Sequence, residues 1–551
     1  MRRLRHSSQS LTPQHKQDRA VHSSQLGLRN MMATPARATM VLILCLLCCY
    51  APVLSSAAAA DFLKCLSASV PNQLVFTQSS PSFTSVLVSS IRNPRFFTPS
   101  TVRPLCIVTP TTASHVQAAV RCGRTNGVRL RVRSGGHDYE GLSYRSEKPE
   151  VFAVVDLGNL RAVRVNRADA TAWVDSGATV GELYYAVGKA DPQLAFPAGV
   201  CPTIGIGGHF SGGGIGMMMR KHGLSVDNVI DATLVDANGN LLDKRAMGRD
   251  LFWALRGGGG ESFGVVLSWK VRLARVPPRV TFFNVAKTVG QGAVDAVTKW
   301  QTIAPALPDE LTVRVVLQNQ QAQFQSLYLG SCDQLLPVIS ARFPELGVTR
   351  VDCKEMTWLQ SMVYMSFFNT NTPPEALLNR TTSLGTSTKN KSDYVKQAIA
   401  KDAWQRIFPW FNGPNTGLII LEPNGGMVSR VADGDTPYPH RSGVLYNIQY
   451  INFWGSGNDG TAAMNWVNGL YKFMEPFVSK NPRAAYVNYR DLDIGQNAVV
   501  GGVSSYESAR VWGERYFGAA NFKRLAITKG KTDPSDFFRN EQSIPPLVPR
   551  K

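Results

Sequence analysis

Charged side chains are scarce in this sequence: they make up only 18% of its 551 residues, whereas hydrophobic side chains make up 44%. An intrinsically disordered chain has the opposite composition, low in hydrophobic residues and high in charge, so general disorder is excluded. Neither an internal repeat nor a heptad is present. A folded chain of this length exceeds one ordinary domain, and we expect two or three lobes.

Long hydrophobic runs are also missing. The most apolar stretch, Met40–Leu54, has about 15 residues, whereas a membrane-spanning helix needs about 20. A basic, polar segment precedes it and the small residues Ser55–Ala60 follow it, which is the order of a secretory signal peptide. We therefore interpret residues 1–60 as an N-terminal extension and signal peptide, with Met31 and Met32 as alternative starts. A signal anchor is the alternative, and no membrane association is expected after cleavage.

The net charge of +20 does not form a nucleic-acid footprint. Without residues 1–60 the chain keeps 52 basic and 38 acidic side chains, a net charge of +14. It contains no Lys/Arg run with interleaved aromatic residues, no zinc-finger spacing and no RNA-binding aromatic motif. Nucleic acid is therefore not expected as a partner. Loose affinity for an acidic polysaccharide matrix suits a basic secreted protein better.

Cysteine is sparse, and three of the nine cysteines leave with the signal peptide. In an oxidising compartment the other six favour disulfides. Cys65 and Cys122 are one candidate pair and Cys332 and Cys353 another, which leaves Cys106 in an apolar strand and Cys201 in a loop.

Two glycosylation sequons begin at Asn379 and Asn390, in a polar stretch. Together with the signal peptide they predict a secreted glycoprotein of the extracellular space or cell wall.

The pattern of short apolar strands and amphipathic helices predicts an α+β fold. A helix at 180–189 and a hairpin turned at Asn238-Gly239 belong to a first block that ends near residue 275. The Pro-rich segment VPPRV then marks a boundary. We expect domains at 61–278 and 279–480, the second with a sheet that could cover a cofactor. Residues 481–551 form a tail with an aromatic-rich helix.

Glycine is concentrated in three segments, RSGGHDYEG (133–141), AGVCPTIGIGGHFSGGGIG (198–216) and RGGGGESFG (256–264). Glycine lets backbone N–H groups approach an anion such as a pyrophosphate. The spacing after Gly205-Ile-Gly207 is not that of a nicotinamide-binding Rossmann fold, and a Walker A lysine is missing. The loops predict a dinucleotide or large anion held by a different fold; tight turns in a β-rich protein are the alternative.

His137 and Cys201 stand in two of these loops. A loop cysteine beside glycines in a secreted protein suggests covalent use. A zinc site built from His137, Cys201, His209 and His222 is the rival, but no C-x-x-C or H-x-x-x-H spacing supports it, and no metal is expected.

The segments RSGGHDYEGLSY and FPAGVCPTIGIGGHFSGGGIGMMMRKHGLSVDN resemble the berberine bridge enzyme-like flavoproteins of plants, whose flavin domain is of the vanillyl-alcohol oxidase/PCMH type. The resemblance runs from about Asp61 to the C-terminus and includes PYPHRSGVLYNIQY, AYVNYRDLDIG and FRNEQSIPPL. It looks closest to the grass-pollen group 4 allergen branch. It implies a PCMH-type FAD-binding domain at 61–278, a substrate domain at 279–480 with an antiparallel sheet over the flavin, and a C-terminal segment that returns to the FAD domain.

The resemblance also implies FAD attached covalently through His137 and Cys201, with a raised reduction potential and no loss of the cofactor into a dilute extracellular space. The family's N-terminal disulfide maps onto Cys65 and Cys122. The remaining cofactor-binding residues that we expect are Ser134, Gly135, Gly136, Gly199, Gly205, Gly207, Gly208, Gly212, Gly213 and Gly258.

The expected catalytic residues are Tyr139, Gln449, Tyr486 and Tyr489. Oxidising an alcohol needs hydride transfer to flavin N5 and a base for the hydroxyl proton. Glutamine cannot serve as that base, so a tyrosine would act as phenolate, with its pKa lowered from about 10. In the monolignol-oxidising branch a lysine and a tyrosine stand where this chain has Asn447 and Ile215. Berberine-forming members carry a glutamate base on this strand, so berberine bridge chemistry itself is not expected.

Ile204 matches the family position that controls oxygen access to the reduced flavin, where bulk beyond valine accompanies dehydrogenase behaviour. We expect an FAD-dependent oxidoreductase, monomeric, that oxidises a small-molecule alcohol or a sugar at its anomeric hydroxyl. A quinone-like compound or oxygen would be the electron acceptor. A monolignol or other allylic alcohol is the second candidate substrate, and a catalytically silent wall or allergen-like protein is the alternative of another class.

Overall fold

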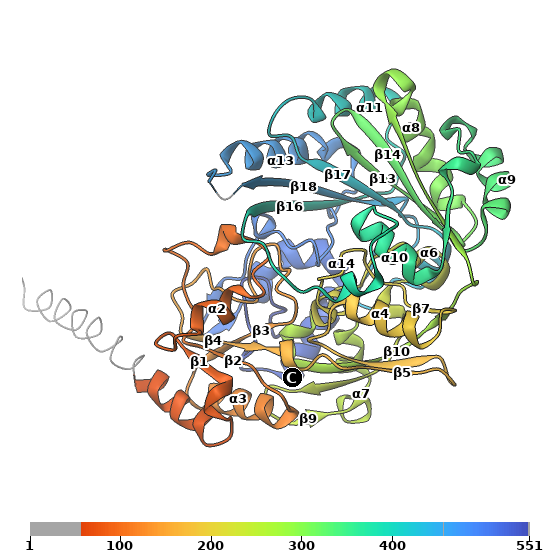
Figure 1. The fold of residues 1–551 in the computed structure, drawn as a ribbon. Coiled ribbons are helices and arrows are strands. Elements are labelled where there is room, and N and C mark those ends of the chain that lie inside the picture. Colours follow the sequence, from red (N-terminus) through yellow and green to blue (C-terminus); the bar gives the residue numbers. More distant parts are fainter. Residues whose placement is uncertain (1–56, 456, 549–551) are drawn as a thin grey trace, which may run out of the picture. The chain divides into compact units, whose positions relative to one another are not determined.

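Three larger sheets and the helices around them organise residues 57–455 and 457–548, the part of the chain that the computed structural model describes (Figure 1). The architecture is mixed α+β, as the sequence predicts. The predicted signal peptide, including Met40–Leu54, falls almost wholly outside the described residues; only 57–60 of it are described, and they begin a helix over 57–67. Among the described residues, no helix combines the length and the apolar character that crossing a bilayer requires.

The first sheet has the strand order β1-β2-β4-β3, with β2, β4 and β3 parallel. Its strands are β1 (Val75–Thr77), β2 (Cys106–Val108), β3 (Arg129–Arg133) and β4 (Phe152–Asp156). Helix α3 (Ala113–Thr125) connects β2 to β3, as parallel strands require a crossover. Strand β3 ends directly before the first glycine-rich loop, so this sheet holds the start of that loop in place.

The second sheet is antiparallel, with the order β5-β6-β10-β8-β9. Its strands are β5 (Val163–Asn166), β6 (Thr171–Asp175), β8 (Val229–Val235), β9 (Leu241–Leu242) and β10 (Val265–Arg272). Strands β8 and β9 form the hairpin predicted at Asn238-Gly239, where Gly239 has a φ of 76°. The second glycine-rich segment runs from β7 (Leu194–Ala195) into α5 (Ile206–Ser211).

The third sheet is antiparallel, with the order β15-β12-β14-β13-β17-β18-β16. Its strands are β12 (Val280–Thr288), β13 (Leu311–Gln318), β14 (Gln321–Tyr328), β15 (Lys354–Met356), β16 (Thr386–Val395), β17 (Leu418–Pro423) and β18 (Tyr446–Gly455). Helices α8 (Ala293–Ile303), α11 (Lys401–Ile407) and α13 (Thr461–Phe473) cover one face, with Trp300 and Trp404 fully buried there (Figure 1). The opposite face is left for the cavity described below.

The C-terminal segment packs back onto the first two sheets. Helix α14 (Tyr506–Thr532) contacts α7 (Lys244–Leu255), and Phe537 and Phe538 join the core beneath the first sheet. The remaining helices and strands are α2 (Phe83–Val88), α4 (Val180–Ala190), α6 (Met219–His222), α9 (Cys332–Arg342), α10 (Trp358–Phe367), α12 (Gly426–Arg430), β11 (Ala274–Arg275), β19 (Val499–Val500) and β20 (Val503–Ser504).

Two disulfides join Cys65 to Cys122 and Cys332 to Cys353, the two pairs that the sequence offers. The first links the helix at 57–67 to α3 and closes a loop over 57 positions of sequence. Within the described part of the chain Cys106 and Cys201 are free, Cys106 buried and Cys201 half-buried.

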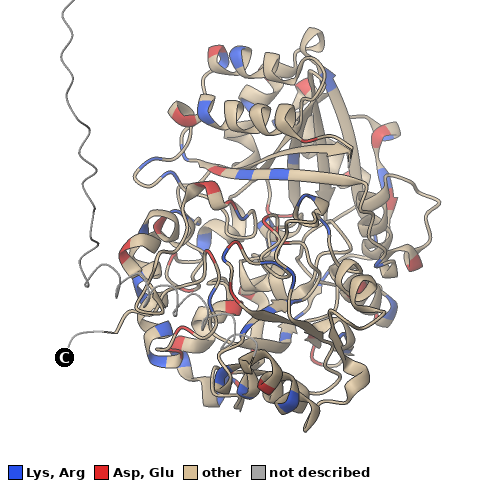
Figure 2. Ribbon diagram, turned by 90° about the vertical axis from the view of Figure 1, so that its left-hand side faces the viewer, with Lys and Arg blue, Asp and Glu red and all other residues tan. Residues whose placement is uncertain are grey.

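Strand β16 lies at the edge of the third sheet, and buried ion pairs cover it. Lys389 Nζ lies 2.7 Å from Glu140 Oε1 and 2.8 Å from Asp491 Oδ1, and Lys391 Nζ lies 2.8 Å from Asp491 Oδ2. An unpaired edge strand invites pairing with other chains, but β16 is buried from Ser387 onward, and Asn93 makes two hydrogen bonds to the Thr388 backbone. Elsewhere basic and acidic residues are interspersed over the ribbon (Figure 2).

The same cover overturns one of the two glycosylation predictions. Asn390 is only 1% exposed, because it lies inside β16, where its side chain accepts a hydrogen bond from Gln449. A glycan has no space there, and the polar run 386–393 is a buried strand rather than a surface loop. Asn379 is exposed and remains a predicted glycosylation site.

Candidate functional site

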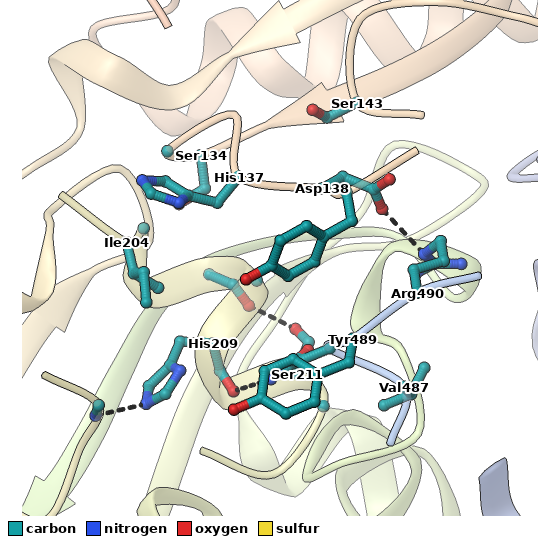
Figure 3. A pocket seen from close by; sticks show the side chains of 18 of the residues that line it. Ser134, His137, Asp138, Ser143, Ile204, His209, Ser211, Val487, Tyr489 and Arg490 are labelled. Carbon is teal, nitrogen blue, oxygen red and sulfur yellow. Dashed lines mark hydrogen bonds and ion pairs between the residues drawn. The ribbon is translucent and has the colours of Figure 1, made fainter. Parts of the chain in front are cut away.

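A cavity of about 420 Å³ lies between the glycine-rich loops and the open face of the third sheet. The first loop follows β3, the second leads into α5, and β17 and β18 supply the opposite wall. Figure 3 shows His137 and Ile204 on one side of this space and Tyr489 on the other. The volume is in the range of small-molecule sites in proteins.

The first two loops touch each other through glycine backbone. A Cβ atom on Gly135 would lie 2.4 Å from the Gly205 nitrogen, and one on Gly205 would lie 2.2 Å from the Gly135 nitrogen. The Ser134 hydroxyl donates to the Ser176 carbonyl at 2.6 Å and ties the first loop to β6. Gly208 faces open space, so backbone at the start of α5 is accessible to a ligand. These contacts form a narrow cradle that larger side chains would fill.

Most of the predicted cofactor-binding residues line the cavity. They are Ser134, Gly135, Gly136, His137, Gly199, Cys201, Gly205, Gly207, Gly208 and Gly212.

Two of the predicted glycines, Gly213 and Gly258, do not line the cavity wall. A Cβ atom on Gly213 would meet the rings of Tyr438 and Tyr486, and one on Gly258 would meet Leu525. These two glycines permit close packing behind the site. Neighbouring residues of the same loops, including Gly216 and Gly259, line the cavity in their place.

His137 and Cys201 approach each other through one hydroxyl. His137 Nε2 lies 2.9 Å from Thr203 Oγ1, and Cys201 Sγ lies 3.4 Å from the same oxygen. Burial lowers the pKa of His137 to about 3, and the positive charge of Arg92 acts in the same direction. The imidazole is therefore neutral at ordinary pH and has a lone pair available for bonding.

The other two histidines of the zinc alternative do not converge with this pair on a metal site. His209 Nε2 accepts a hydrogen bond of 3.0 Å from the Gly199 amide, which fixes the second loop, and burial lowers its pKa to about 4. Among the described residues, no group of three His, Cys, Asp or Glu side chains has the arrangement of a metal site.

Tyr139 and Gln449 meet across the cavity. Gln449 Nε2 donates to the Tyr139 hydroxyl and to Asn390 Oδ1, both at 2.9 Å. Because both amide hydrogens are used, Gln449 Oε1 is the atom left to accept a hydrogen bond from a substrate hydroxyl.

Tyr486 has a different role from that of Tyr489. The Tyr486 oxygen accepts from the Gly214 amide at 2.9 Å and from Asn488 Nδ2 at 2.9 Å, so it holds the glycine loop in place. Among the described residues the Tyr489 hydroxyl has no hydrogen-bond partner, and its ring packs edge-on against Tyr486 and Tyr139.

Burial acts against a tyrosine phenolate. It raises the pKa of Tyr139 and of Tyr486 to about 12, and it raises that of Tyr489 well above 10, where the charge of Glu422 adds to the effect. These phenols are therefore neutral at ordinary pH.

Glu422 is a functional candidate that the sequence analysis missed. It lines the cavity from β17, with Oε1 3.7 Å from Arg314 Nη1 and Oε2 buried without a hydrogen-bond partner among the described residues. Burial raises its pKa, and Arg314 opposes that change. The sequence does contain a sign of this role, because Glu422 is the only acidic residue in GLIILEP. Strand β17 pairs Ile420 with Gln449, and Glu422, two residues after Ile420, therefore lies on the same face of the sheet as Gln449.

Ion pairs connect the first loop to the C-terminal segment at the far end of the cavity. Arg490 Nε lies 2.8 Å from Asp138 Oδ2 (Figure 3), and Arg490 Nη2 lies 2.7 Å from Glu261 Oε1. Arg490 therefore holds the first and third glycine-rich loops and the C-terminal segment in one arrangement.

Comparisons with known proteins agree with this site. Residues 104–244 match the family of the FAD binding domain, and residues 485–545 match the family "Berberine and berberine like". Berberine bridge enzyme-like Cyn d 4 of Cynodon dactylon is 57% identical over 488 residues, covering 89% of this chain and 93% of that protein.

Two solved structures are similar over nearly the whole described region. Wild-type Phl p 4.0202, named as a glucose dehydrogenase, is 55% identical with a TM-score of 0.88, covering 89% of this chain and 100% of the other. An isoleucine-to-valine variant of Phl p 4, named as a glucose oxidase, is 54% identical with the same TM-score and coverage.

Proposed function

Because the chain belongs to the family of berberine bridge enzyme-like FAD-binding oxidoreductases, we propose that it carries FAD attached to both His137 and Cys201 and oxidises the anomeric hydroxyl of a carbohydrate. The observation that carries the proposal is the cavity itself. His137 and Cys201 line this cavity together with the hydrogen-bonding side chains of Glu422, Gln449 and Tyr489.

The residues present fit an FAD cofactor. The contact between Gly135 and Gly205 and the open backbone at Gly208 form the narrow cradle that a dinucleotide needs. When bound, the flavin supplies the acceptor for the hydride that leaves the substrate carbon. A covalent link would keep it on a protein that works in a dilute extracellular space.

Glu422 is the proposed proton acceptor. A carboxylate with one unpartnered oxygen in a cavity can take the hydroxyl proton of a substrate, whereas the neutral phenols of Tyr139 and Tyr489 cannot take that proton near neutral pH. Gln449 Oε1 would orient the same hydroxyl, and Arg314 would keep Glu422 ionised.

The substrate class rests on the polar groups and on the relatives. Carboxylate, amide and phenol groups converge from three elements, and the relative Phl p 4 is named as a glucose dehydrogenase. Ile204 lines the cavity, and the Phl p 4 variant named as a glucose oxidase carries valine for isoleucine. We therefore propose dehydrogenase behaviour with a quinone-like acceptor, in a secreted and glycosylated monomer.

The test uses the purified protein. We expect a yellow polypeptide whose flavin survives acid precipitation, and reduction of a quinone dye with glucose at a higher kcat/KM than with coniferyl alcohol. Turnover of coniferyl alcohol without turnover of any sugar would show that the substrate is a monolignol rather than a carbohydrate. A colourless protein would refute the enzyme proposal and favour a wall protein without activity.

A further inference from the structure

Thr203 occupies a central position between the two attachment residues. Its hydroxyl lies within hydrogen-bond range of both His137 Nε2, at 2.9 Å, and Cys201 Sγ, at 3.4 Å. We propose that Thr203 prepares both side chains for flavin attachment, by fixing the tautomer of His137 and by donating a hydrogen bond to the sulfur of Cys201. The inference rests on the covalent FAD proposed above.

Two arrangements of the shared hydrogen bonds are possible in principle, since a hydroxyl has one hydrogen to donate. Thr203 could donate to His137 and accept from the thiol, or accept from His137 and donate to the sulfur. The second arrangement is the one that attachment through His137 requires. Because Nε2 faces the Thr203 hydroxyl, Nδ1 is the nitrogen left for attachment, and a lone pair on Nδ1 places the ring hydrogen on Nε2.

His137 therefore carries its hydrogen on Nε2 and directs it at Thr203. The lone pair then lies on Nδ1, which becomes the nitrogen that can bond to the flavin. The Thr203 hydrogen is left for Cys201 Sγ, and this hydrogen bond orients the sulfur beside His137.

The backbone holds Thr203 in place independently of any ligand. The Gly181 amide donates to the Pro202 carbonyl and the Val180 amide to the Ile204 carbonyl, both at 2.8 Å. The first turn of α4 thus anchors the residues on both sides of Thr203. A Cβ atom on Gly135 would lie 3.0 Å from the Thr203 carbonyl, so the first loop is in contact with the same turn.

Arg92 supplies a positive charge near the same pair. Its Nη1 and Nη2 donate to the Thr381 and Arg380 carbonyls at 2.9 and 2.8 Å, which fixes the guanidinium. The charge interacts with both His137 and Cys201. A fixed cation disfavours the imidazolium, so Arg92 favours the neutral state of His137 that attachment requires.

Each attachment balances as a two-electron oxidation. At His137 one C–N bond forms while one flavin C–H bond and the imidazole N–H bond break; at Cys201 one C–S bond forms while one C–H and the S–H bond break. The two protons and two electrons released each time reduce the flavin and then pass to a two-electron acceptor, oxygen or a quinone. Thr203 receives the hydrogen bond of the N–H that breaks at His137.

The experiment compares Thr203→Val, which keeps the shape and removes the hydroxyl, with Thr203→Ser, which keeps the hydroxyl. Thr302→Val, at an exposed threonine of α8, is the matched control. Each holoprotein is assayed by intact mass, by flavin retained after acid precipitation, and by mapping of flavinylated peptides at His137 and Cys201. A melting temperature for each variant reports folding.

We expect Thr203→Val to attach flavin about 10- to 100-fold more slowly at both residues, the loss typical of one or two hydrogen bonds, with an unchanged melting temperature. Thr203→Ser and Thr302→Val should match the wild type. Wild-type attachment in Thr203→Val, or an equal defect in Thr203→Ser, would overturn the role of the hydroxyl. A wild-type protein without covalent flavin would instead refute the attachment proposal itself, and the Thr203 inference with it.

Discussion

Replacing Glu422 with glutamine removes the proposed proton acceptor and leaves the shape of the cavity unchanged. The carboxylate lies in the cavity wall with one unpartnered oxygen, and its side chain is 12% exposed. Glutamine keeps the hydrogen-bonding capacity and loses the ability to take a proton near neutral pH. The rate constant of flavin reduction should therefore fall far more than substrate affinity does.

The magnitude follows from two effects. General-base catalysis contributes about 10²- to 10⁴-fold to a rate, equivalent to about 3–5 kcal/mol of transition-state stabilisation. The attraction between Glu422 and Arg314 at 3.7 Å is at most about 4.5 kcal/mol at an effective dielectric constant near 20, and it favours the carboxylate. Arg314→Met should therefore keep much of the maximal rate but move the acid limb of the pH profile to higher pH.

The sign of the pH dependence is determined by the direction of the shift. Burial raises the pKa of Glu422, and the active form is the ionised one, so kcat/KM should rise with pH through a pKa above that of a free glutamate. Anaerobic stopped-flow measurement of flavin bleaching between pH 4 and 9 gives the rate constant of flavin reduction and the pKa of the acid limb. Glu345→Gln, at an exposed ion pair with Lys299, is the control. A Glu422→Gln rate within threefold of wild type, with the acid limb retained, would refute Glu422 as the base.

Three further results are expected. Ile204→Val should raise the rate of flavin reoxidation by oxygen without changing its reduction by substrate, measured by oxygen uptake; unchanged uptake would remove Ile204 from oxygen control. Lys389→Met leaves Glu140 buried without its cation and Asp491 paired only with Lys391, and it should lower the free energy of unfolding by about 3–5 kcal/mol, measured by urea denaturation; a loss below 1 kcal/mol would contradict this. Asn379→Gln should remove a glycan and increase gel mobility in the protein from a plant host, whereas Asn390→Gln should not change glycan mass.

The sequence predicted the loops better than it predicted the sheet. Glycine-rich segments and the Asn238-Gly239 turn have local causes, because only a few residue types tolerate positive φ or close backbone approach, and the structure forms them where expected. His137 and Cys201 were recognisable because they stand inside such segments.

Glu422 and Asn390 show what local patterns do not contain. Glu422 reaches the cavity through the register between β17 and β18, and register is fixed by partners distant in the sequence. Asn390 lies in a polar stretch that resembles a surface loop, yet Asp491 and Glu140 neutralise the lysines on either side of it and bury the strand. Pairing of charges across 100 residues or more is not visible in a sequence window.

Mixing the purified wild-type protein with glucose in the absence of oxygen tests the central claim most directly. The account predicts that flavin absorbance bleaches in a single phase whose rate saturates with increasing glucose concentration. One flavin should be reduced per polypeptide, and all of that flavin should be covalently bound. Flavin that stays oxidised with glucose and other aldoses, while an allylic alcohol bleaches it, would contradict the account.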